Sequence, residues 1–542
     1  MSQDLDAKLL ELQRRRNSLP IFGLDCLKIR TKAGKIVPFE LNEAQTVLHE
    51  TIERQLAELG FIRALVLKGR QQGISTYTAA RFYWKSSLRK GVNVYILAHE
   101  QAASDKLFDI VDRYQTLNPL RPHVGASNAK ELVFDKLDSR YMVATAGTKA
   151  GGRGGTVSLL HGSEVAFWAN APDHFAASVQ GVPLEDGTEI ILESTSAGAG
   201  GEFYERWLDA EAGRGDYIPI FLPWWLSSEY RRKPPEGFEL SSDADDDMMS
   251  EVEYAETYGL DMEQMCWRRN KIIELRSEIT FMREYPATPA EAWTAAAGME
   301  PFISSLLATR CTKRKNIEGV GPLILGVDPA SNGGDRFSVS ARRGQKVLWT
   351  KYRNKIDSLE GTAWIKELID TLNPARVNID TGNIGAAIVT NLKSYGPKYV
   401  KIVRGVNFGA TSQAKLAKPK APGPKNVRAE IWGRMRDWMA DRDNPASLPD
   451  MDALRTDLSA PQLKPQPNND FLLESKTDMK KRKVRSPDLA DSIALTFTFN
   501  EFFDGVQLYE TEQEKFGQPE VLTKPSQPAH VPPASGQTGW MG

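Results

Sequence analysis

The chain has 542 residues, which is longer than one compact domain usually is, so at least two domains are expected. Hydrophobic residues make up 41% of it and charged residues 26%, and no run of about 18 apolar residues predicts a membrane-spanning helix. The 69 basic and 70 acidic residues give a net charge of −1, which neither indicates nor excludes a nucleic-acid partner. Three cysteines lie far apart, without the spacing of a metal site or a disulfide framework, and suit a reducing cytoplasm.

Composition and hydrophobic pattern divide the chain into five expected segments. Met1–Arg16 is charged and helical in pattern, without the apolar stretch of a signal peptide. Arg231–Asp247 is Pro-rich and then acidic, which indicates a surface linker, and Ser250–Arg283 has a helical pattern. The expected segments are a helical N-terminus (1–35), a first α/β domain (36–230), a linker with a helical subdomain (231–318), a second α/β domain (319–505) and a flexible tail (506–542).

In the first α/β domain, short β-rich runs alternate with helical stretches. The runs are apolar throughout, as expected for strands that are buried on both faces. A doubly wound, mostly parallel sheet is therefore predicted. Its strands are Ala64–Leu67, Val92–Ala98, Leu132–Phe134, Tyr141–Thr145, Val157–Leu160 and Glu189–Leu192.

A different pattern begins near Pro322. Three strands that read as an antiparallel meander come first, and helices and strands alternate after them. This order is typical of the ribonuclease H-like fold. The predicted elements are the strands Leu323–Asp328, Phe337–Ala341 and Lys346–Tyr352, the helix Leu359–Leu372, the strand Val377–Asp380, the helix Ile384–Tyr395 and the strand Val400–Val403.

The loop after the first predicted strand has the features of a phosphate-binding site. It lies between a strand and a helical stretch, where backbone N–H groups can cradle phosphate. Against the pattern GxxxxGK[ST], Gly73 and Ser75 match, whereas Ile74 replaces the lysine and Lys68 the first glycine. An ordinary strand–turn–helix therefore stays open. The expected nucleotide-binding residues of the loop are Lys68, Gly69, Arg70, Gln71, Gln72, Gly73, Ile74, Ser75 and Thr76.

Three further segments favour a nucleotide hydrolase. Gln45 precedes the loop by about one helix, a placement in which a glutamine can contact adenine. Glu164 follows the strand Val157–Leu160, where such enzymes place the carboxylate that activates water. Ser194 and Thr195 follow another strand and supply hydroxyls for sensing the γ-phosphate. One strand-end glutamate is usually a solvated cap, but four elements in this order favour catalysis.

Four stretches resemble the ATPase half of the large terminase subunits of tailed bacteriophages: RQQGIST, HGSEVAFW, ILESTSAGAGGEFYERW and EYPATPAEAW. In that family a basic residue early in the loop can replace the usual lysine. The resemblance therefore implies that Arg70 or Lys68 contacts the phosphates of Mg-ATP. It also implies that Ser75 or Thr76 ligates the Mg²⁺ ion.

The same resemblance assigns roles to two strand ends. Glu164 corresponds to the catalytic glutamate, and Ser194 and Thr195 correspond to the coupling motif. Ser163 departs from the family, because many members have an aspartate there. We therefore expect this strand to hold Mg²⁺ through water rather than directly.

Aspartates at three places predict a metal-dependent nuclease in the second domain. Asp328 and Asp380 end the first and fourth strands, which are neighbours in a ribonuclease H-like sheet. Asp488 and Asp491 open the helix Leu489–Phe499 and share one helical face. Clustered carboxylates repel unless cations neutralise them, and two Mg²⁺ or Mn²⁺ ions about 4 Å apart would do so. Each aspartate alone is more often a cap or turn residue, but their combined order favours catalysis by Asp328, Asp380 and Asp488, with Asp491 as a further metal ligand.

Two basic runs flank these acids and are expected to hold DNA phosphates. The second run also resembles a nuclear localisation signal, although such short matches are common by chance. The residues are Lys415, Lys418, Lys420 and Lys425 in the first run, and Lys480, Lys481, Arg482, Lys483 and Arg485 in the second.

The order of the acids and the stretch SPDLADS resemble the terminase nuclease domain, so the resemblance covers roughly residues 36–500. It implies a P-loop (ASCE-type) ATPase domain followed by a ribonuclease H-like nuclease domain. It further implies double-stranded DNA, the portal and prohead and the small terminase subunit as partners. The resemblance also implies a homo-oligomeric ring on the portal, as a pentamer. It implies no membrane and places the action in the bacterial cytoplasm.

Two other functions stay open. One is an ATPase-linked repair or recombination nuclease, which would not depend on a portal or a small terminase. The other is a non-catalytic DNA-binding scaffold with a degenerate nucleotide site, which Ile74 and Ser163 favour. Arg153 is expected to be an arginine finger, a DNA contact or an incidental loop residue. The tail from Gly517, rich in Pro, Gln, Ser and Gly, is expected to be disordered and to be either a weak docking segment or inert.

Overall fold

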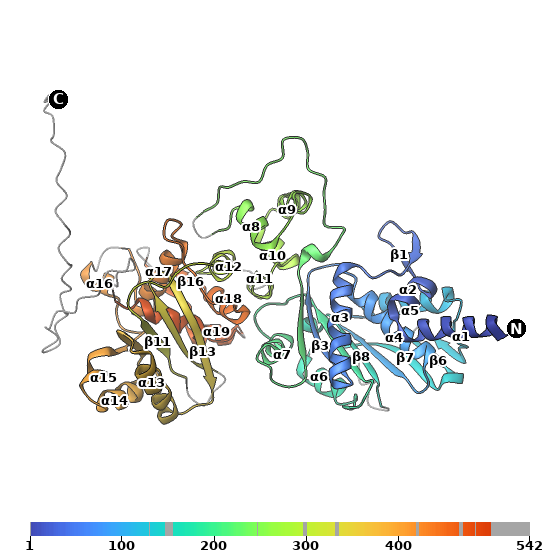
Figure 1. The fold of residues 1–542 in the computed structure, drawn as a ribbon, viewed down its shortest axis with the longest axis horizontal. Coiled ribbons are helices and arrows are strands. Elements are labelled where there is room, and N and C mark those ends of the chain that lie inside the picture. Colours follow the sequence, from blue (N-terminus) through green and yellow to red (C-terminus); the bar gives the residue numbers. More distant parts are fainter. Residues whose placement is uncertain are drawn as a thin grey trace.

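The computed structural model describes residues 2–128, 130–146, 156–245, 248–295, 301–330, 335–418, 422–465, 470–482 and 484–499. Two α/β units lie at opposite sides of the molecule, and a group of short helices lies between them (Figure 1). Residues 2–128 include the N-terminal helices α1 (Ser2–Asn17) and α2 (Leu19–Cys26) and the hairpin β1 (Lys28–Arg30) and β2 (Ile36–Pro38).

The first unit is built on an eight-stranded sheet with the order β10-β3-β9-β8-β4-β7-β6-β5. Pairing is parallel from β10 to β7 and antiparallel for β6 and β5. The predicted mostly parallel sheet is therefore confirmed. The strands are β3 (Ile62–Lys68), β4 (Asn93–Ala98), β5 (Ala126–Asn128), β6 (Glu131–Phe134), β7 (Ser139–Thr145), β8 (Leu159–Ser163), β9 (Glu189–Ser194) and β10 (Ile218–Leu222).

Three of these strands differ from the prediction. Strand β5 was not predicted, because it is only three residues long and has no apolar run. The strand predicted at Val157–Leu160 begins at Leu159 and continues to Ser163, so the residues before Glu164 belong to it. Strand β10 was not predicted, because Pro219 interrupts its apolar run. Proline is tolerated at β10 because this strand lies at the edge of the sheet.

Helices cover both faces of the first sheet, and each face has its own hydrophobic core. The helix after the phosphate-binding loop is fixed to the sheet by a buried ion pair. Arg81 donates two hydrogen bonds to Glu189 at the start of β9, at 2.7 and 2.9 Å. The helices are α3 (Glu43–Leu59), α4 (Ile74–Leu88), α5 (Gln101–Leu117), α6 (Ala171–Val179) and α7 (Glu202–Glu211).

The predicted helical stretch Ser250–Arg283 consists of three helices. Gly259 and Arg276, both at positive φ, end the first two. Stacked aromatic rings form the core of this segment, including Tyr230 on Trp267 with centroids 4.4 Å apart. The three helices are α8 (Glu251–Tyr258), α9 (Met262–Leu275) and α10 (Glu278–Glu284). Two further short helices follow them, α11 (Pro289–Ala295) and α12 (Ser305–Lys313).

The second unit has a five-stranded sheet with the order β13-β12-β11-β14-β15. Strands β11, β12 and β13 are antiparallel neighbours, and β11, β14 and β15 are parallel ones. This topology confirms the predicted ribonuclease H-like fold. The strands are β11 (Ile324–Asp328), β12 (Arg336–Arg343), β13 (Lys346–Asn354), β14 (Arg376–Asp380) and β15 (Val403–Val406), with a small hairpin of β16 (Leu463–Pro465) and β17 (Phe471–Leu473).

One predicted strand of this unit is wrong. Val400–Val403 was predicted from its valines, but the helix α15 (Pro397–Ile402) occupies most of this range. Pro397 at the first helical turn favours the helix, and the strand β15 begins only at Val403. The other helices are α13 (Ser358–Leu372), α14 (Gly385–Ser394), α16 (Gln413–Ala417), α17 (Val427–Ala440), α18 (Asp452–Ser459), α19 (Lys476–Lys481) and α20 (Asp488–Ala494).

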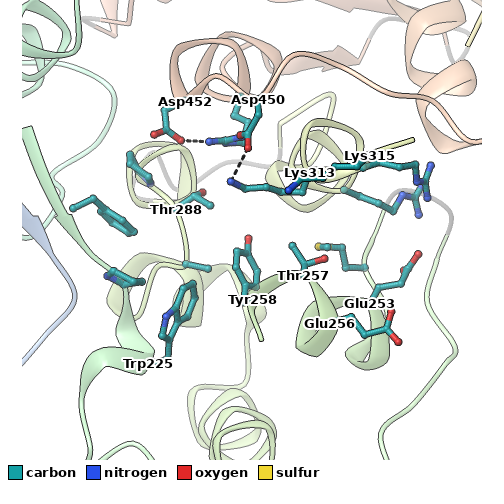
Figure 2. A pocket seen from close by; sticks show the side chains of 18 residues that line it. Trp225, Glu253, Glu256, Thr257, Tyr258, Thr288, Lys313, Lys315, Asp450 and Asp452 are labelled. Atoms are coloured by element: carbon teal, nitrogen blue, oxygen red, sulfur yellow. Dashed lines mark hydrogen bonds and ion pairs between the residues drawn. The ribbon is translucent and has the colours of Figure 1, made fainter. Parts of the chain in front are cut away.

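The helical segment connects the two units. Helix α11 packs against α18, and Trp293 and Met479 belong to one buried cluster. A cavity of about 840 Å³ opens at this joint (Figure 2). Ion pairs that involve Lys313, Asp450 and Arg455 line one side of the cavity, and Trp225 and Tyr258 line the other.

Cys26, Cys266 and Cys311 are buried and free, as the cysteine spacing predicts. Among the described residues, no helix is both long and apolar enough to cross a membrane.

Candidate functional sites

Residues at the start of α3 hold the loop between β3 and α4 in place through hydrogen bonds. Gln45 donates to the Gly73 carbonyl (2.7 Å), and Asn42 donates to the Gln72 carbonyl (3.2 Å). Gly73 adopts a φ of 78°, and a Cβ there would lie 2.7 Å from the Gln45 amide nitrogen. The Gln45 amide oxygen accepts from the Asn42 N–H, so both ends of this side chain position the loop. A contact of Gln45 with adenine stays a prediction.

Lys68 is the buried cation of this loop. Its ammonium lies 3.0 Å from a carboxylate oxygen of Glu164 and 3.0 Å from one of Glu193. Burial alone would lower the pKa of Lys68, but the two carboxylates outweigh that effect and raise the pKa above its ordinary value. Lys68 therefore carries a positive charge beneath the predicted phosphate-binding loop.

Glu164 meets the predicted coupling residues. Its second carboxylate oxygen accepts hydrogen bonds from the Thr195 backbone N–H (3.0 Å) and hydroxyl (3.1 Å), and Ser194 Oγ lies 3.4 Å away. The Glu164 side chain is 25% exposed, so water can reach it. The structure thus brings Glu164, Ser194 and Thr195 together.

Glu193 was not predicted, although it is the most fully enclosed acid of the site. Ser75 and Ser163 donate to the same carboxylate oxygen at 2.7 and 2.9 Å, and His161 Nε2 lies 3.4 Å from it. Burial alone would raise the pKa of Glu193, but Lys68 and its other partners lower it far below the ordinary value. An acid that directly follows the apolar run Ile190–Leu192, just before the predicted coupling residues, is the signal that could have identified it.

Arg70 lies on the outside of the loop. Its side chain is 62% exposed and forms an ion pair with Glu284, and its backbone N–H donates to the Glu284 carbonyl (3.0 Å). Tyr230 donates to the Arg70 carbonyl at 2.6 Å. The helical segment therefore contacts the loop directly, through the stretch that begins EYPATP.

The second site lies where β11, β14 and α20 meet. The parallel pairing of Val327 with Ile379 makes β11 and β14 neighbours, as predicted, so Asp328 and Asp380 end adjacent strands. Asp488 and Asp491 enter from the first turns of α20, and both are buried. The predicted acids therefore occupy one end of the sheet.

Lys476, which the sequence reasoning missed, lies among these acids. Its ammonium is 2.9 Å from Asp328, 3.3 Å from Asp488 and 3.2 Å from Asp491. Lys476 is the first residue of the short helix α19. Apart from its place near a basic run, the sequence gave no signal that it lies beside the acids of α20.

The four aspartates have different environments. Burial raises the pKa of Asp328 well above its ordinary value, and its neighbouring carboxylates add to this while Lys476 opposes it. Burial also raises the pKa of Asp380, although hydrogen bonds from backbone N–H groups stabilise its charged form and oppose this rise. Burial alone would raise the pKa of Asp491 as well, but Arg428 (3.0 Å), Lys476 and the Trp432 N–H (2.8 Å) lower it.

Divalent cations such as Mg²⁺ and Mn²⁺ prefer carboxylate oxygens as ligands. In the part of the chain that the structure describes, no three acidic, His or Cys side chains lie close enough to hold a metal ion as arranged. The Lys476 ammonium provides the positive charge among Asp328, Asp488 and Asp491 instead. The chemistry of this donor set fits a hard divalent cation if Lys476 moves away from the carboxylates.

The basic residues predicted to bind DNA are largely paired with acids of the same unit. Lys415 contacts Asp470 (2.6 Å), Lys480 contacts Asp335 (3.1 Å) and Lys481 contacts Asp478 (3.2 Å). Arg482 donates to Glu474 (2.8 Å). A role of these residues in DNA binding stays a prediction. Lys420, Lys483, Arg153 and the tail from Gly517 lie outside the described residues.

Comparison with protein-family models and with curated proteins gives no match. Among solved structures, the large terminase of bacteriophage HK97 is similar over 89% of this chain and 99% of its own, with 12% identity and a TM-score of 0.38. For the large terminase of the thermophilic bacteriophage D6E the shares are 85% and 100%, with 10% identity and a TM-score of 0.32. For the nuclease domain of the large terminase subunit of bacterial virus Sf6 they are 36% and 96%, with 19% identity and a TM-score of 0.31. Because these identities and TM-scores are low, the functional conclusion rests on the two sites themselves.

Proposed function

We propose that the chain is a large terminase subunit, in which an ATP-hydrolysing motor is joined to a metal-dependent DNA endonuclease. The motor translocates double-stranded viral DNA into a prohead, and the nuclease cuts concatemeric genome DNA. The observation that carries this proposal is the presence in one chain of two separate sites. One is a phosphate-binding loop with Lys68 and Glu164, and the other is a cluster of aspartates on a ribonuclease H-like sheet.

At the motor site, the residues support hydrolysis of the γ-phosphate of ATP. Backbone N–H groups of the loop and of the start of α4 bind the phosphates, and Lys68 supplies positive charge. Glu164 accepts a proton from the attacking water as the bond from the γ-phosphorus to the bridging oxygen breaks. Ser75 fits as a ligand of Mg²⁺, which neutralises charge on the β- and γ-phosphates when bound.

Thr195 suits the proposed coupling role. The Thr195 N–H and hydroxyl both donate to the Glu164 carboxylate. A change at the γ-phosphate that moves this carboxylate would therefore also move the end of β9. Strand β9 leads to the segment before α7, which packs against the joint. Ser194 and Thr195 thus connect the state of the nucleotide to the helical segment.

At the nuclease site, Asp328, Asp380, Asp488 and Asp491 would hold two Mg²⁺ or Mn²⁺ ions. When bound, such ions activate a water molecule and stabilise the leaving oxygen of a phosphodiester. Asp491 is held by Arg428 and Trp432, so it is oriented before any metal binds. The basic runs around Lys415 and Lys480 would contact DNA phosphates once DNA competes for their acidic partners.

The proposal extends to organisation and partners. The division into 1–35, 36–230, 231–318, 319–505 and 506–542 is the proposed domain structure. The portal, the prohead and the small terminase subunit are the proposed protein partners, with a homo-oligomeric ring on the portal. The bacterial cytoplasm is the proposed place of action.

A pair of variants of the full chain tests the proposal. Glu164→Gln should keep ATP binding and DNA cleavage but lose ATP turnover, by ~100-fold or more, because an amide cannot accept the proton. Asp328→Asn should lose Mn²⁺-dependent DNA cleavage and keep ATP turnover. Packaging of DNA into proheads by the unmodified chain distinguishes a terminase from a repair nuclease. Absence of both ATP turnover and DNA cleavage in the unmodified chain would leave only the scaffold function.

A further inference from the structure

The end of β8 lacks a charge that its position would be expected to carry. In nucleotide hydrolases of this kind, the acid before the catalytic glutamate holds Mg²⁺ together with the loop hydroxyl. Here that position is Ser163, which has no charge, and it lies directly before Glu164. A site for Mg-ATP that relied on β8 alone would have only one carboxylate.

The neighbouring strand supplies a carboxylate at the same level. Strands β8 and β9 are paired in parallel, and Ser163 lies opposite Glu193 in the register. The Glu193 carboxylate oxygen that accepts from Ser163 (2.9 Å) also accepts from Ser75 (2.7 Å). One buried oxygen of Glu193 thus links Ser163 at the end of β8 to the Ser75 hydroxyl, which is expected to bind Mg²⁺.

The charge of Glu193 is fixed by its surroundings. Its side chain is 0% exposed, and its second oxygen lies 3.0 Å from the Lys68 ammonium. An ionised carboxylate at such a buried place is costly unless it is paired and hydrogen-bonded, and Glu193 has both kinds of partner. The fold therefore holds the Glu193 carboxylate between the Lys68 ammonium and the Ser75 hydroxyl.

We propose that Glu193 replaces the missing aspartate of β8, so that the carboxylate that positions Ser75 for Mg²⁺ comes from β9 instead. This inference rests on the proposed ATPase function and makes Glu193 a positioning residue. Its place directly before Ser194 and Thr195 puts the metal-positioning acid and the coupling motif on one strand end. Loss or gain of the metal would then act on the same backbone segment that holds Glu164.

The alternative is that Glu193 only compensates the charge of Lys68. The two roles differ in one measurable respect, which is how much Mg²⁺ strengthens ATP binding. A residue that positions the metal ligand changes this ratio, whereas a purely structural counter-ion changes folding stability and leaves the ratio alone.

The experiment measures ATP affinity of the full chain with Mg²⁺ and with EDTA, together with thermal unfolding to confirm folding. Glu193→Gln should reduce the Mg²⁺-dependent gain in affinity by ~10-fold or more, because a charge-assisted hydrogen bond to Ser75 is lost. The double variant Ser163→Asp with Glu193→Ser moves the carboxylate back to β8 and should recover most of the gain. Glu131→Gln, on strand β6 of the same sheet and paired with the exposed side chain of Arg140, is the control and should keep the ratio of the unmodified chain.

An unchanged Mg²⁺ dependence in a folded Glu193→Gln protein would overturn the inference. A double variant that folds but shows no more Mg²⁺ dependence than Glu193→Gln would overturn it as well. If the unmodified chain itself fails to bind Mg-ATP, the proposed motor function fails instead, so the two failures are distinguishable.

Discussion

Lys68 and Arg70 are two residues apart, yet they occupy opposite environments. Lys68 is buried between two carboxylates, whereas Arg70 is exposed and paired with Glu284 of the helical segment. In the proposed motor site, a cation that touches Glu164 would lie next to the reacting γ-phosphate. The geometry therefore favours Lys68 as the residue that replaces the missing loop lysine.

Substitution of these two cations separates their roles. Lys68→Ala should weaken ATP binding by ~100-fold or more, since it leaves Glu164 and Glu193 without their buried counter-ion. Arg70→Ala should weaken it by less than ~10-fold. ATP affinity measured by titration, alongside thermal unfolding, decides between them, and Lys68→Arg serves as the charge-conserving control. A larger loss of ATP affinity in Arg70→Ala than in Lys68→Ala would assign the phosphate contact to Arg70 instead.

At this scale, the sequence predicts residues that follow local patterns and misses those that depend on strand register. Glu164 and Asp328 were found because each lies at or just after the end of an apolar strand. Glu193 was missed because its importance comes from lying opposite Ser163, and pairing of β8 with β9 is a tertiary fact. Lys476 was missed for the same kind of reason, since the hairpin of β16 and β17 brings it to acids from β11 and α20.

Among the elements, the short helix α19 supplies a cation to the proposed nuclease site. Its first residue, Lys476, balances the charge of three buried aspartates. A lysine ammonium and a divalent cation compete for such carboxylates, since both are attracted by the same charge. Movement of α19 would therefore control when a metal ion enters.

Lys476→Ala should make the chain less stable in EDTA and raise its affinity for Mn²⁺ by ~10-fold or more. The reason is that three aspartates lose the ammonium of Lys476 while their mutual repulsion remains. Calorimetric titration with Mn²⁺ and thermal unfolding with and without the metal measure both effects. Lys480→Ala removes a cation from the exposed side of the same helix and should change neither. Equal Mn²⁺ affinity in Lys476→Ala and the unmodified chain would contradict the competition.

The helix α11 carries a buried acid at the joint. Glu291 accepts from the Ala287 N–H (2.8 Å) and from the Tyr258 hydroxyl (3.3 Å). Burial raises the pKa of Glu291 from 4.5 to about 7, with Arg268 opposing and Glu278 adding to the rise. The folded chain therefore keeps a proton that the unfolded chain has already lost over this pH range.

The sign of the pH effect follows from this raised pKa. The stabilising contribution of protonated Glu291 is complete below a pH of about 4.5 and is lost as the pH rises through about 7. Glu291→Gln, which resembles the protonated acid, should therefore reduce the fall in unfolding free energy between pH 5 and pH 8 by up to roughly 3 kcal/mol. Denaturant titrations at several pH values measure this difference. Glu256→Gln, an exposed change at the same cavity, should keep the slope of the unmodified chain, and an equal slope in Glu291→Gln would refute the assignment.

For the whole molecule, the two proposed sites lie on two separate sheets, and the helices between the sheets connect them. The phosphate-binding loop contacts this segment through Arg70 and Glu284, and the second unit contacts it through α18. The sequence predicted both sheets, because strand and helix periodicities are local. It did not predict the joint, because the packing of α11 on α18 joins residues more than a hundred positions apart.

Trp293 is the residue of α11 most deeply involved in this joint. Its ring contacts Tyr204 and Trp207 of the first unit, with centroids 5.1 and 6.0 Å away, and belongs to the buried cluster that includes Met479 of the second. Trp293→Ala should lower the unfolding free energy by ~3–5 kcal/mol, because the cavity cannot be filled by neighbours from separate units.

Because Trp293 packs against both units, its loss should also reduce the cooperativity with which the two units unfold. Differential scanning calorimetry should show a single main transition for the unmodified chain and two resolved transitions for Trp293→Ala. Trp349→Ala, on the edge strand β13 where the ring is only half-buried, is the control and should shift the transition without dividing it. A single, merely shifted transition in Trp293→Ala would show that the two units unfold together through other contacts, such as the ion pair of Lys313 with Asp450.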